Sequence, residues 1–343
     1  MKPLFLKAAI SIAVLSLVFY FVPISNVYSA ILVADPLWVF VGTSLLILLR
    51  VLTALRMQMI ARAQSLDTNS LTMMRIVFTS AFYNILAPGA LAGGAVTYFK
   101  YRQQGVNPVA AVANIFANKA IQLLVVSLSA PLFWLIDKGF SSYAIVSYGL
   151  FMTACFSYAF ALLFGRFGTL RWLESKIKRH GQSVVHRSLT ALCQQLVTIG
   201  QISHRTIFFL VVYSAVHSLF AALAIICFGN ALNIDIGLVP VLWIYAVIYL
   251  LGMLPISISN IGVREVSMIM LLAPYGVLMT EATAWSVLMY SGPLVCALIG
   301  LMFEAEYFWL SRKGQRSIDT VDRQVAAHNN KDTQGESDEG RSG

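Results

Sequence analysis

Long uninterrupted runs of apolar residues constrain this sequence more than any other feature. Several runs approach 20 residues, about the length that an α-helix needs to cross the hydrocarbon core of a bilayer. Hydrophobic residues make up 58% of the 343 positions and charged residues only 11%, whereas about 25% of the residues in a soluble globular chain are charged. The pattern predicts an all-α fold in the form of a polytopic transmembrane helical bundle.

We expect about seven full spans in this bundle. Their predicted bounds are 4–22, 37–59, 108–136, 141–164, 206–229, 238–254 and 281–310. The first run follows Lys2 and Lys7 and therefore also resembles a secretory signal peptide. Because many spans come after it, a retained first helix is the preferred interpretation.

The net charge of +9 reflects an uneven distribution of cations between loops. Lys and Arg cluster in the loop 165–205 and in the tail 312–343, whereas the loops 23–36 and 230–237 contain Asp and no cation. The positive-inside rule then predicts that the basic loop, the tail and both termini are cytoplasmic. The same rule accounts for the basic segments, so we do not predict nucleic acid as a partner. By the same rule, Arg50, Arg56 and Arg62 mark the inner end of the second span.

Two regions follow from this distribution. Residues 1–311 form the transmembrane domain, and residues 312–343 form a polar tail that is expected to be disordered. The loop 165–205 repeats apolar residues at helical spacing, so it is either an amphipathic helix on the inner leaflet or a helix packed under the bundle. The four cysteines are scattered singly, and no pattern predicts a cofactor or a metal.

Two segments fit no simple span, because Pro and Gly interrupt them. The segment 72–104 must enter and leave the membrane on one side if the neighbouring spans keep their orientation. The segment 255–276 is too short for a comfortable span after its break, at about 1.5 Å per residue. Their interrupting residues are Pro88, Gly93 and Gly94 in the first segment, and Pro255 and Gly262 in the second. We therefore expect two re-entrant or broken-helix elements.

The two halves of the chain also repeat one order of features. In each half, a break containing Pro and Gly precedes a short apolar helix, a Gly-Val turn (Gly105 and Gly276) and a long helix. Few residues are identical between the halves, so the repeat rests on this order. Paired Gly/Pro-interrupted segments in two halves are the best sequence indication of a transporter site.

The second break contains the first candidate binding residues. A helix that begins after Asn260 and Gly262 would present its N-terminus and Arg264 together, and both favour a phosphate. Glu265 points about 100° away from Arg264 on a helix, so we expect it to hold Lys119 or another cation and to leave Arg264 free for a ligand. The alternative is a structural salt bridge that locks the re-entrant loop.

Lys119 is the second candidate, because it lies well inside the span 108–136. A cation at the centre of a spanning helix costs about 2.5–3.5 kcal/mol on insertion scales. Asn114, Asn118 and Gln122 share one helix face near it. The alternative is that Lys119 snorkels to the interface.

Two further cations complete the predicted set, and one histidine lies outside it. Lys100 and Arg102 follow the first break and would gather an anion at the inner face. His217 lies inside the span 206–229, where a hydrogen-bonded packing role is preferred over a proton relay.

The motifs APGALAGG, YFKYRQQGV and LPISISNIGVRE resemble the lysylphosphatidylglycerol synthase transmembrane-region family. The resemblance implies that the two Gly/Pro motifs form re-entrant elements and that an anionic or polyprenyl-linked lipid is handled at the bilayer. Two departures stand out: no acidic residue follows Gly93–Gly94, and Asn118–Lys119 replaces a Glu-Arg pair. The soluble aminoacyl-transfer domain of larger relatives has no counterpart here, so lysyl-lipid synthesis is not expected.

The leading hypothesis is a flippase of the bacterial cytoplasmic (inner) membrane. It would move an anionic phospholipid or a lipid-linked phosphate intermediate, with the headgroup held by Lys119 and Arg264. One alternative is a non-transporting partner of an envelope-lipid enzyme. A less favoured one is a lipid-modifying enzyme, since no paired carboxylates, nucleophile with its base or Walker-type loop is evident.

Overall fold

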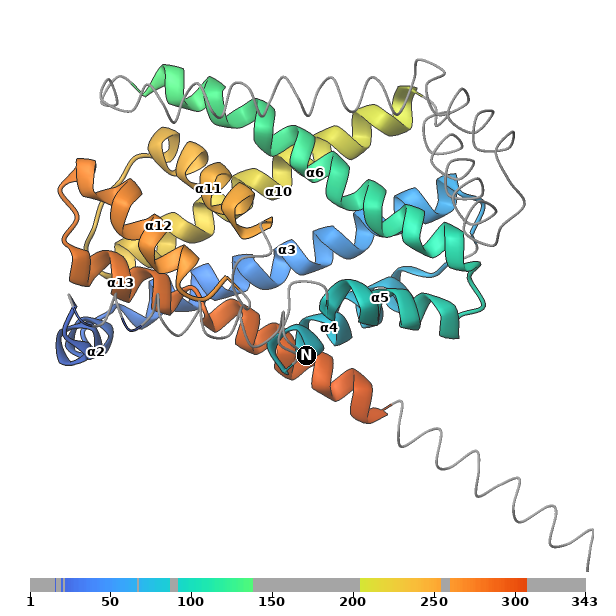
Figure 1. Cartoon of the computed structure of the whole chain (residues 1–343), viewed down its shortest axis with the longest axis horizontal. Coiled ribbons are helices and arrows are strands. Elements are labelled where there is room, and N and C mark those ends of the chain that lie inside the picture. Colours follow the sequence, from blue (N-terminus) through green and yellow to red (C-terminus); the bar gives the residue numbers. More distant parts are fainter. Residues whose placement is uncertain are drawn as a thin grey trace, which may run out of the picture. The chain divides into compact units, whose positions relative to one another are not determined.

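The computed structural model describes Ser16, Tyr20 and the residues 22–66, 68–86, 92–137, 204–253 and 260–306 (Figure 1). Every regular element in these residues is a helix. The predicted all-α membrane bundle is therefore confirmed for this part of the chain. The described residues up to Gly300 belong to one compact unit, and residues 301–306 to a second.

Four helical stretches are long and apolar enough to cross a membrane. They are Pro36–Ala63, Pro108–Ile136, Arg205–Ala231 and Met279–Glu306. Each matches a predicted span within a few residues, and the run predicted at 238–254 is the shorter apolar helix α11 (Leu238–Met253). The predicted spans 4–22 and 141–164, nearly all of the loop 165–205, and the tail 312–343 lie outside the described residues. The total of seven spans thus stays a prediction.

Two of the long helices begin in the same way. Asp35 precedes α3 (Pro36–Ala63) and accepts a hydrogen bond from the Leu37 amide at 2.8 Å. Asn107 precedes α6 (Pro108–Ile136) and accepts one from the Val109 amide at 2.9 Å. In both helices Pro occupies the first helical position, where its missing N–H is not needed.

The described helices fall into two halves with the same order. The first half consists of α3, α4 (Ser70–Leu86), α5 (Ala92–Gln103) and α6; the second consists of α10 (His204–Ala231), α11, α12 (Val263–Leu272) and α13 (Met279–Leu288). In each half, consecutive helices pack against each other. The second helix ends at Leu86 in one half and at Met253 in the other, and the short third helix begins at Ala92 and at Val263. This order supports the predicted repeat.

The turn before the last helix of each half has the same backbone conformation. Gly105 has a φ of 76° and Gly276 a φ of 79°, in the left-handed region that glycine adopts without steric cost. A short 3₁₀ helix, η1 (Ala273–Tyr275), precedes the second of these turns. The predicted Gly-Val turns are therefore confirmed in both halves.

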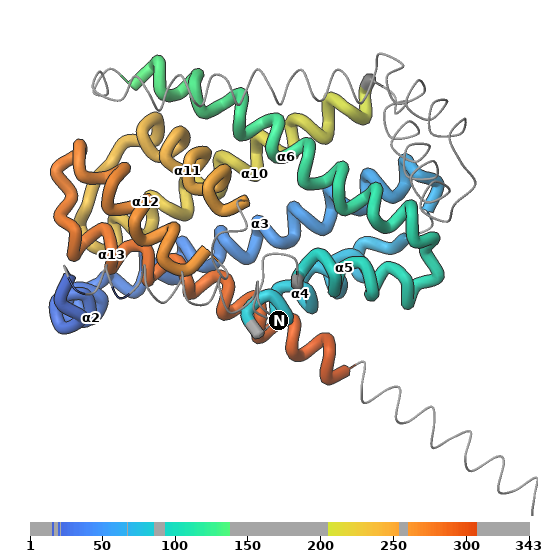
Figure 2. Tube along the Cα trace, viewed as in Figure 1, coloured from blue at the N-terminus to red at the C-terminus, as the bar shows by residue number. Residues whose placement is uncertain are grey.

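Contacts between α3 and α10 join the two halves, and α6 packs against both α10 and α11 (Figure 2). The largest apolar cluster lies around Phe228, Trp243 and Trp285. Gly42 of α3 allows the Phe228 ring to approach, because a Cβ at Gly42 would lie 3.0 Å from that ring. Small residues at such contacts let membrane helices pack closely. The halves are thus held by direct helix packing.

Candidate functional site

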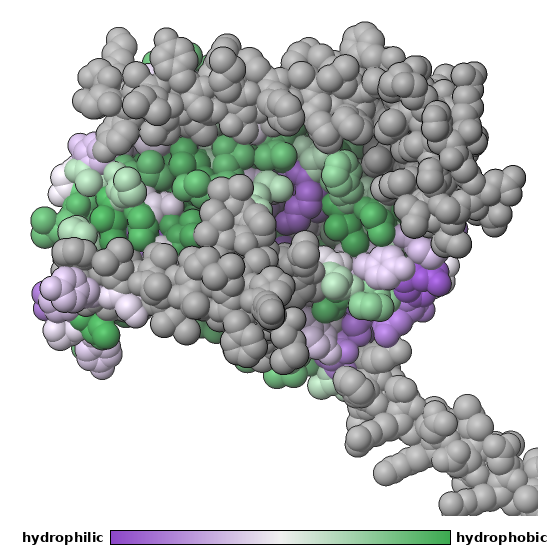
Figure 3. Space-filling model, viewed as in Figure 1, coloured by the Kyte–Doolittle hydropathy of each residue, from purple (hydrophilic) through white to green (hydrophobic). Residues whose placement is uncertain are grey.

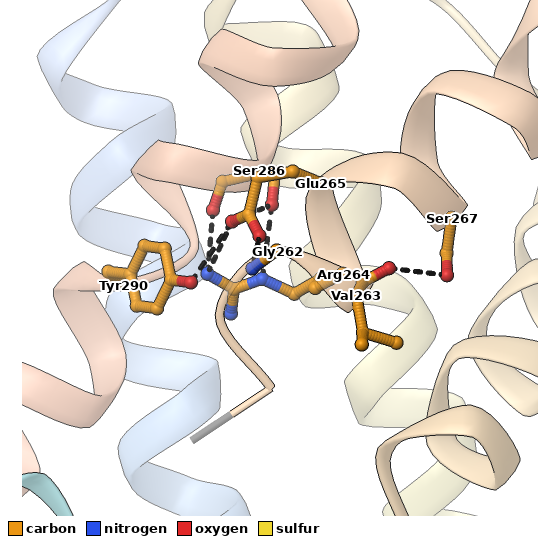
Figure 4. A network of polar contacts seen from close by, with 7 residues as sticks. All are labelled: Gly262, Val263, Arg264, Glu265, Ser267, Ser286 and Tyr290. Carbon is orange, nitrogen blue, oxygen red and sulfur yellow. Dashed lines mark hydrogen bonds and ion pairs between the residues drawn. The ribbon is translucent and has the colours of Figure 1, made fainter. Parts of the chain in front are cut away.

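The second break leads into helix α12 (Val263–Leu272), whose N-terminus is capped by a side chain of the protein itself. Asn260 and Gly262 have positive φ values of 62° and 87°, so the chain turns sharply where the sequence predicted a break. Glu265 is 2% exposed and accepts a hydrogen bond from the Gly262 amide at 2.7 Å (Figure 4). An acidic side chain in the first turn stabilises the positive end of the helix dipole. The anion at this helix N-terminus is therefore the protein's own carboxylate.

Arg264 is engaged in the same network (Figure 4). Its guanidinium donates to the Ser286 hydroxyl at 3.1 Å and to the Ser286 carbonyl at 3.0 Å. It also lies 3.7 Å from the centre of the Tyr290 ring and 3.8 Å from a Glu265 carboxylate oxygen. Ser286 and Tyr290 in turn donate to Glu265 at 2.9 and 3.0 Å. The geometry matches the structural alternative, in which the pair fastens α12 to the helical stretch Met279–Glu306.

Side-chain amides support both breaks. A Cβ at Gly252 of α11 would lie 2.5 Å from Asn260 Nδ2, so Asn260 sits directly on that glycine. At the first break, Asn84 accepts a hydrogen bond from the Gly93 amide at 3.0 Å, and a Cβ at Gly93 would lie 2.8 Å from the Asn84 side chain. Gly94 has open space around it. Pro88 lies outside the described residues.

The predicted polar face of α6 is buried. Asn114, Asn118 and Gln122 are 0%, 5% and 1% exposed, so these side chains share one inward face as their spacing predicts. Asn114 donates to the Met57 carbonyl at 3.1 Å and accepts from the Tyr101 hydroxyl at 3.0 Å. The other two amides face a cation that the sequence analysis did not place in the site.

That cation is Arg56. Its side chain is 4% exposed, and its Nε donates to Asn118 Oδ1 at 2.7 Å. Its Nη1 donates to Gln122 Oε1 and, at 2.8 Å, to Ser214 Oγ of α10. All three acceptors are neutral. The prediction that Arg56 marks the inner end of a span did not anticipate these contacts, because it treats Arg56 as a boundary residue whereas the structure buries it inside the bundle, seven residues before α3 ends at Ala63.

Two more cations lie near Arg56. Lys119 follows Asn118 on α6 but occupies an exposed position, and both Arg50 and Arg56 act on it electrostatically. The same three cations act on His217 of α10. We call Arg50, Arg56 and Lys119 the cation cluster. No ion pair between this cluster and a carboxylate is present in the described part of the chain.

His217 adds an unused polar atom beside the cation cluster. Its Nδ1 is buried and makes no hydrogen bond to any residue that the structure describes. The predicted hydrogen-bonded packing role is therefore wrong for this nitrogen. Figure 3 shows a small hydrophilic patch among hydrophobic residues near the middle of the face in view.

The remaining predicted cations lie elsewhere. Arg102 in the last turn of α5 donates to the Val106 carbonyl at 2.8 Å and closes the turn at Gly105. Lys100 is half-buried in the same turn. Among the described residues, no hydrogen bond or ion pair joins either of them to Arg50, Arg56 or Lys119. The structure therefore does not bring Lys100 and Arg102 together with the cation cluster.

Asp137 anchors the opposite end of α6. It accepts hydrogen bonds from Trp243 Nε1 at 3.0 Å and from the Tyr275 hydroxyl. Burial and the neighbouring carboxylate raise the pKa of Tyr275, so its hydroxyl stays protonated and donates. This contact ties α6 to α11 and η1. Among the residues that the structure describes, no group of three His, Cys, Asp or Glu side chains could hold a metal ion.

Comparison with known proteins agrees with the resemblance of the motifs. The family model described as "Lysylphosphatidylglycerol synthase TM region" matches residues 4–300. No curated protein matches the chain significantly. The match covers both halves of the repeat and both breaks. The chain is therefore an integral membrane protein that belongs to the lysylphosphatidylglycerol synthase transmembrane-region family.

Proposed function

We propose that this protein is a flippase that moves an anionic phospholipid or a lipid-linked phosphate intermediate across the bilayer. The observation that carries the proposal is the cation cluster, in which Arg56 is buried, Arg50 is half-buried and Lys119 is exposed, and which has no carboxylate partner among the described residues. Cations within membrane spans are costly and mark substrate pathways when they are retained. An anionic headgroup would supply the missing charge.

The repeated fold supports this proposal. Two halves with one broken helix each, joined by α3 and α10, have the architecture in which transporters place a site between repeats. Arg56 of α3 contacts α6 of its own half and α10 of the other. The cation cluster therefore lies where movement of one half against the other would change it.

The position of the cation cluster also indicates how a lipid headgroup would reach it. Lys119 is exposed on α6, about 16 Å from the start of that helix at 1.5 Å per residue. A headgroup could reach Lys119 while its acyl chains remain in the surrounding lipid. We place the protein in the bacterial cytoplasmic membrane with both termini in the cytoplasm, and we assign it no chemical step.

A reconstitution experiment tests the proposal. Purified protein would be reconstituted into vesicles that contain an anionic phospholipid with a label on one acyl chain. Movement of the lipid from the inner to the outer leaflet would be measured as the fraction of label that a membrane-impermeant reagent can reach. We expect the wild type and Arg205→Gln to move the lipid, because Arg205 is an exposed cation at the start of α10. Lys119→Met should abolish movement. Equal movement by all three, or none by the wild type together with co-purification of one lipid enzyme, would contradict the proposal.

A further inference from the structure

We infer that the cation cluster binds a lipid headgroup that ends in a phosphomonoester or a diphosphate, a group with at least two negative charges. This inference rests on the proposed function and names the substrate class of the same site. It follows from three observations: the charge of the cluster, its unused donors, and the different arrangement in the second half of the chain.

The first observation is charge. Arg56 is buried and donates only to uncharged oxygens. Lys119 directly follows the Arg56 acceptor Asn118 on α6, and Arg50 lies six residues before Arg56 on α3. A phosphodiester carries about one negative charge, so it would leave most of the cluster unmatched. A terminal phosphate carries about −1.5 to −2 at neutral pH. Balancing buried charge lowers the cost of desolvation, and the doubly charged group is therefore the better match.

The second observation is the supply of unused donors. The hydrogen bonds of Arg56 come from Nε and Nη1, so the two N–H groups of Nη2 have no acceptor among the described residues. Lys119 makes no hydrogen bond there either, and His217 Nδ1 is an orphaned buried atom. Arg binds phosphate oxygens with two parallel hydrogen bonds. These groups come from three helices, α3, α6 and α10.

The third observation is the contrast between the repeats. When Gly105 is aligned with Gly276, Gly93 and Gly94 fall opposite Arg264 and Glu265, and Lys119 falls opposite Tyr290. The second half therefore contains a cation with its own buried carboxylate, at 3.8 Å. The first half has glycines in place of that charged pair and a lysine in place of the tyrosine. A ligand would supply there the negative charge that Glu265 supplies in the second half.

A pair of matched lipids tests the inference. Phosphatidic acid and phosphatidylmethanol with identical acyl chains differ in whether the phosphate is a monoester or a diester. Their binding to the purified full chain would be titrated by native mass spectrometry. We expect the wild type and Arg205→Gln to prefer phosphatidic acid by at least about tenfold. The preference should fall to near unity in Lys119→Gln and in Arg50→Gln, two variants that avoid the buried Arg56.

Free phosphate in solution carries the same charged group as the lipid headgroup, so it is tested as a competing ligand. Inorganic phosphate and pyrophosphate would be added as competitors at equal concentrations. If either displaces phosphatidic acid at an equal concentration, the site binds the free anion and the lipid assignment is wrong. Equal binding of both lipids by the wild type, or an unchanged preference in both variants, would also overturn the inference.

The vesicle assay separates this inference from the proposed function. Movement of phosphatidylmethanol that depends on Lys119, without any preference for phosphatidic acid, would keep the transporter and overturn the charge class. Selective binding of phosphatidic acid without movement of any lipid would keep the site and contradict the transporter.

Discussion

At the scale of residues, two cation sites of the bundle differ in their charge compensation. Arg264 lies against a buried carboxylate, a serine and an aromatic ring. Arg56 has only neutral acceptors, and Lys119 has none among the described residues. Uncompensated charge destabilises a folded membrane protein, and the proposed headgroup site rests on this difference. The compensated pair instead ties α12 to the helix that follows it.

Lys119→Met should therefore stabilise the protein while it abolishes lipid movement. The substitution removes the positive charge that Arg50 and Arg56 repel and leaves an uncharged side chain of similar length. We expect the midpoint of thermal unfolding in detergent to rise by no more than about 2–4 °C, because Lys119 is exposed and the repulsion is partly screened there. A lower midpoint would show that Lys119 has a structural role.

Glu265→Ala should have the opposite effect on stability. It leaves the Gly262 amide and the hydroxyls of Ser286 and Tyr290 without their acceptor, and it removes the carboxylate partner of Arg264. Breaking a buried ion pair by removing one partner costs about 3–5 kcal/mol. Chemical unfolding of the single variants and of Arg264→Ala/Glu265→Ala would measure the coupling, and the double variant should lose less than the sum of the singles. Additive losses would show that the two residues act independently.

Sequence reasoning identified only part of these sites. The inward face of Asn114, Asn118 and Gln122 followed from the helical period, because local spacing determines it. Arg56 was assigned to the inner end of a span, although it lay inside the predicted range 37–59. Its contacts with α6 and α10 depend on how distant helices pack, and no local pattern encodes them.

At the scale of elements, glycines are needed for two different reasons: a left-handed backbone conformation and close packing between helices. Gly105 and Gly276 need a left-handed backbone but have open space around them. Gly300 lies against α4, since a Cβ there would come within 2.1 Å of the Phe78 carbonyl oxygen. The turns therefore constrain the conformation of one residue, whereas the packing contact constrains two helices.

Alanine substitution should separate these glycines. Gly105→Ala and Gly276→Ala should each cost about 1–2 kcal/mol through backbone strain, and asparagine should be tolerated better at both positions. Gly300→Ala should cost clearly more, because backbone atoms cannot move aside. Thermal unfolding of the purified variants measures the order. A small effect at Gly300 would contradict the close contact with α4.

The breaks themselves could be predicted because Pro and Gly interrupt apolar runs locally. The contacts that stabilise the breaks could not be predicted, because Asn84 contacts Gly93 and Asn260 contacts Gly252, and each pair spans a break. The occupation of the α12 N-terminus by Glu265 was also not anticipated. A carboxylate three residues after a glycine break was the signal that could have indicated it.

At the scale of the whole molecule, the order of helices repeated in the two halves accounts for the sequence pattern. Most span bounds and the order of features in each half followed from hydropathy and from Gly and Pro. The packing of α3 against α10, and of α6 against α11, is a property of the folded bundle. That packing brings cations from different helices into one cluster.

A crosslink tests whether movement between helices is needed. Thr43 of α3 and Ser291 have hydroxyl oxygens 2.7 Å apart, so cysteines at both positions should form a disulfide. We expect oxidation to stop lipid movement in vesicles and reduction to restore it, with each single cysteine variant unaffected. Movement that continues in the crosslinked protein would show that this contact stays closed during transport.

The most direct test of the account is to identify the lipids that remain bound after gentle purification. Native mass spectra of the wild type, Lys119→Met, Arg264→Gln and Arg205→Gln would be compared with the composition of the host membrane. The account predicts one enriched anionic lipid class that Lys119→Met loses and that Arg264→Gln and Arg205→Gln retain. Bound lipids that mirror the bulk membrane in all four proteins would contradict the claim that the cation cluster is a headgroup site.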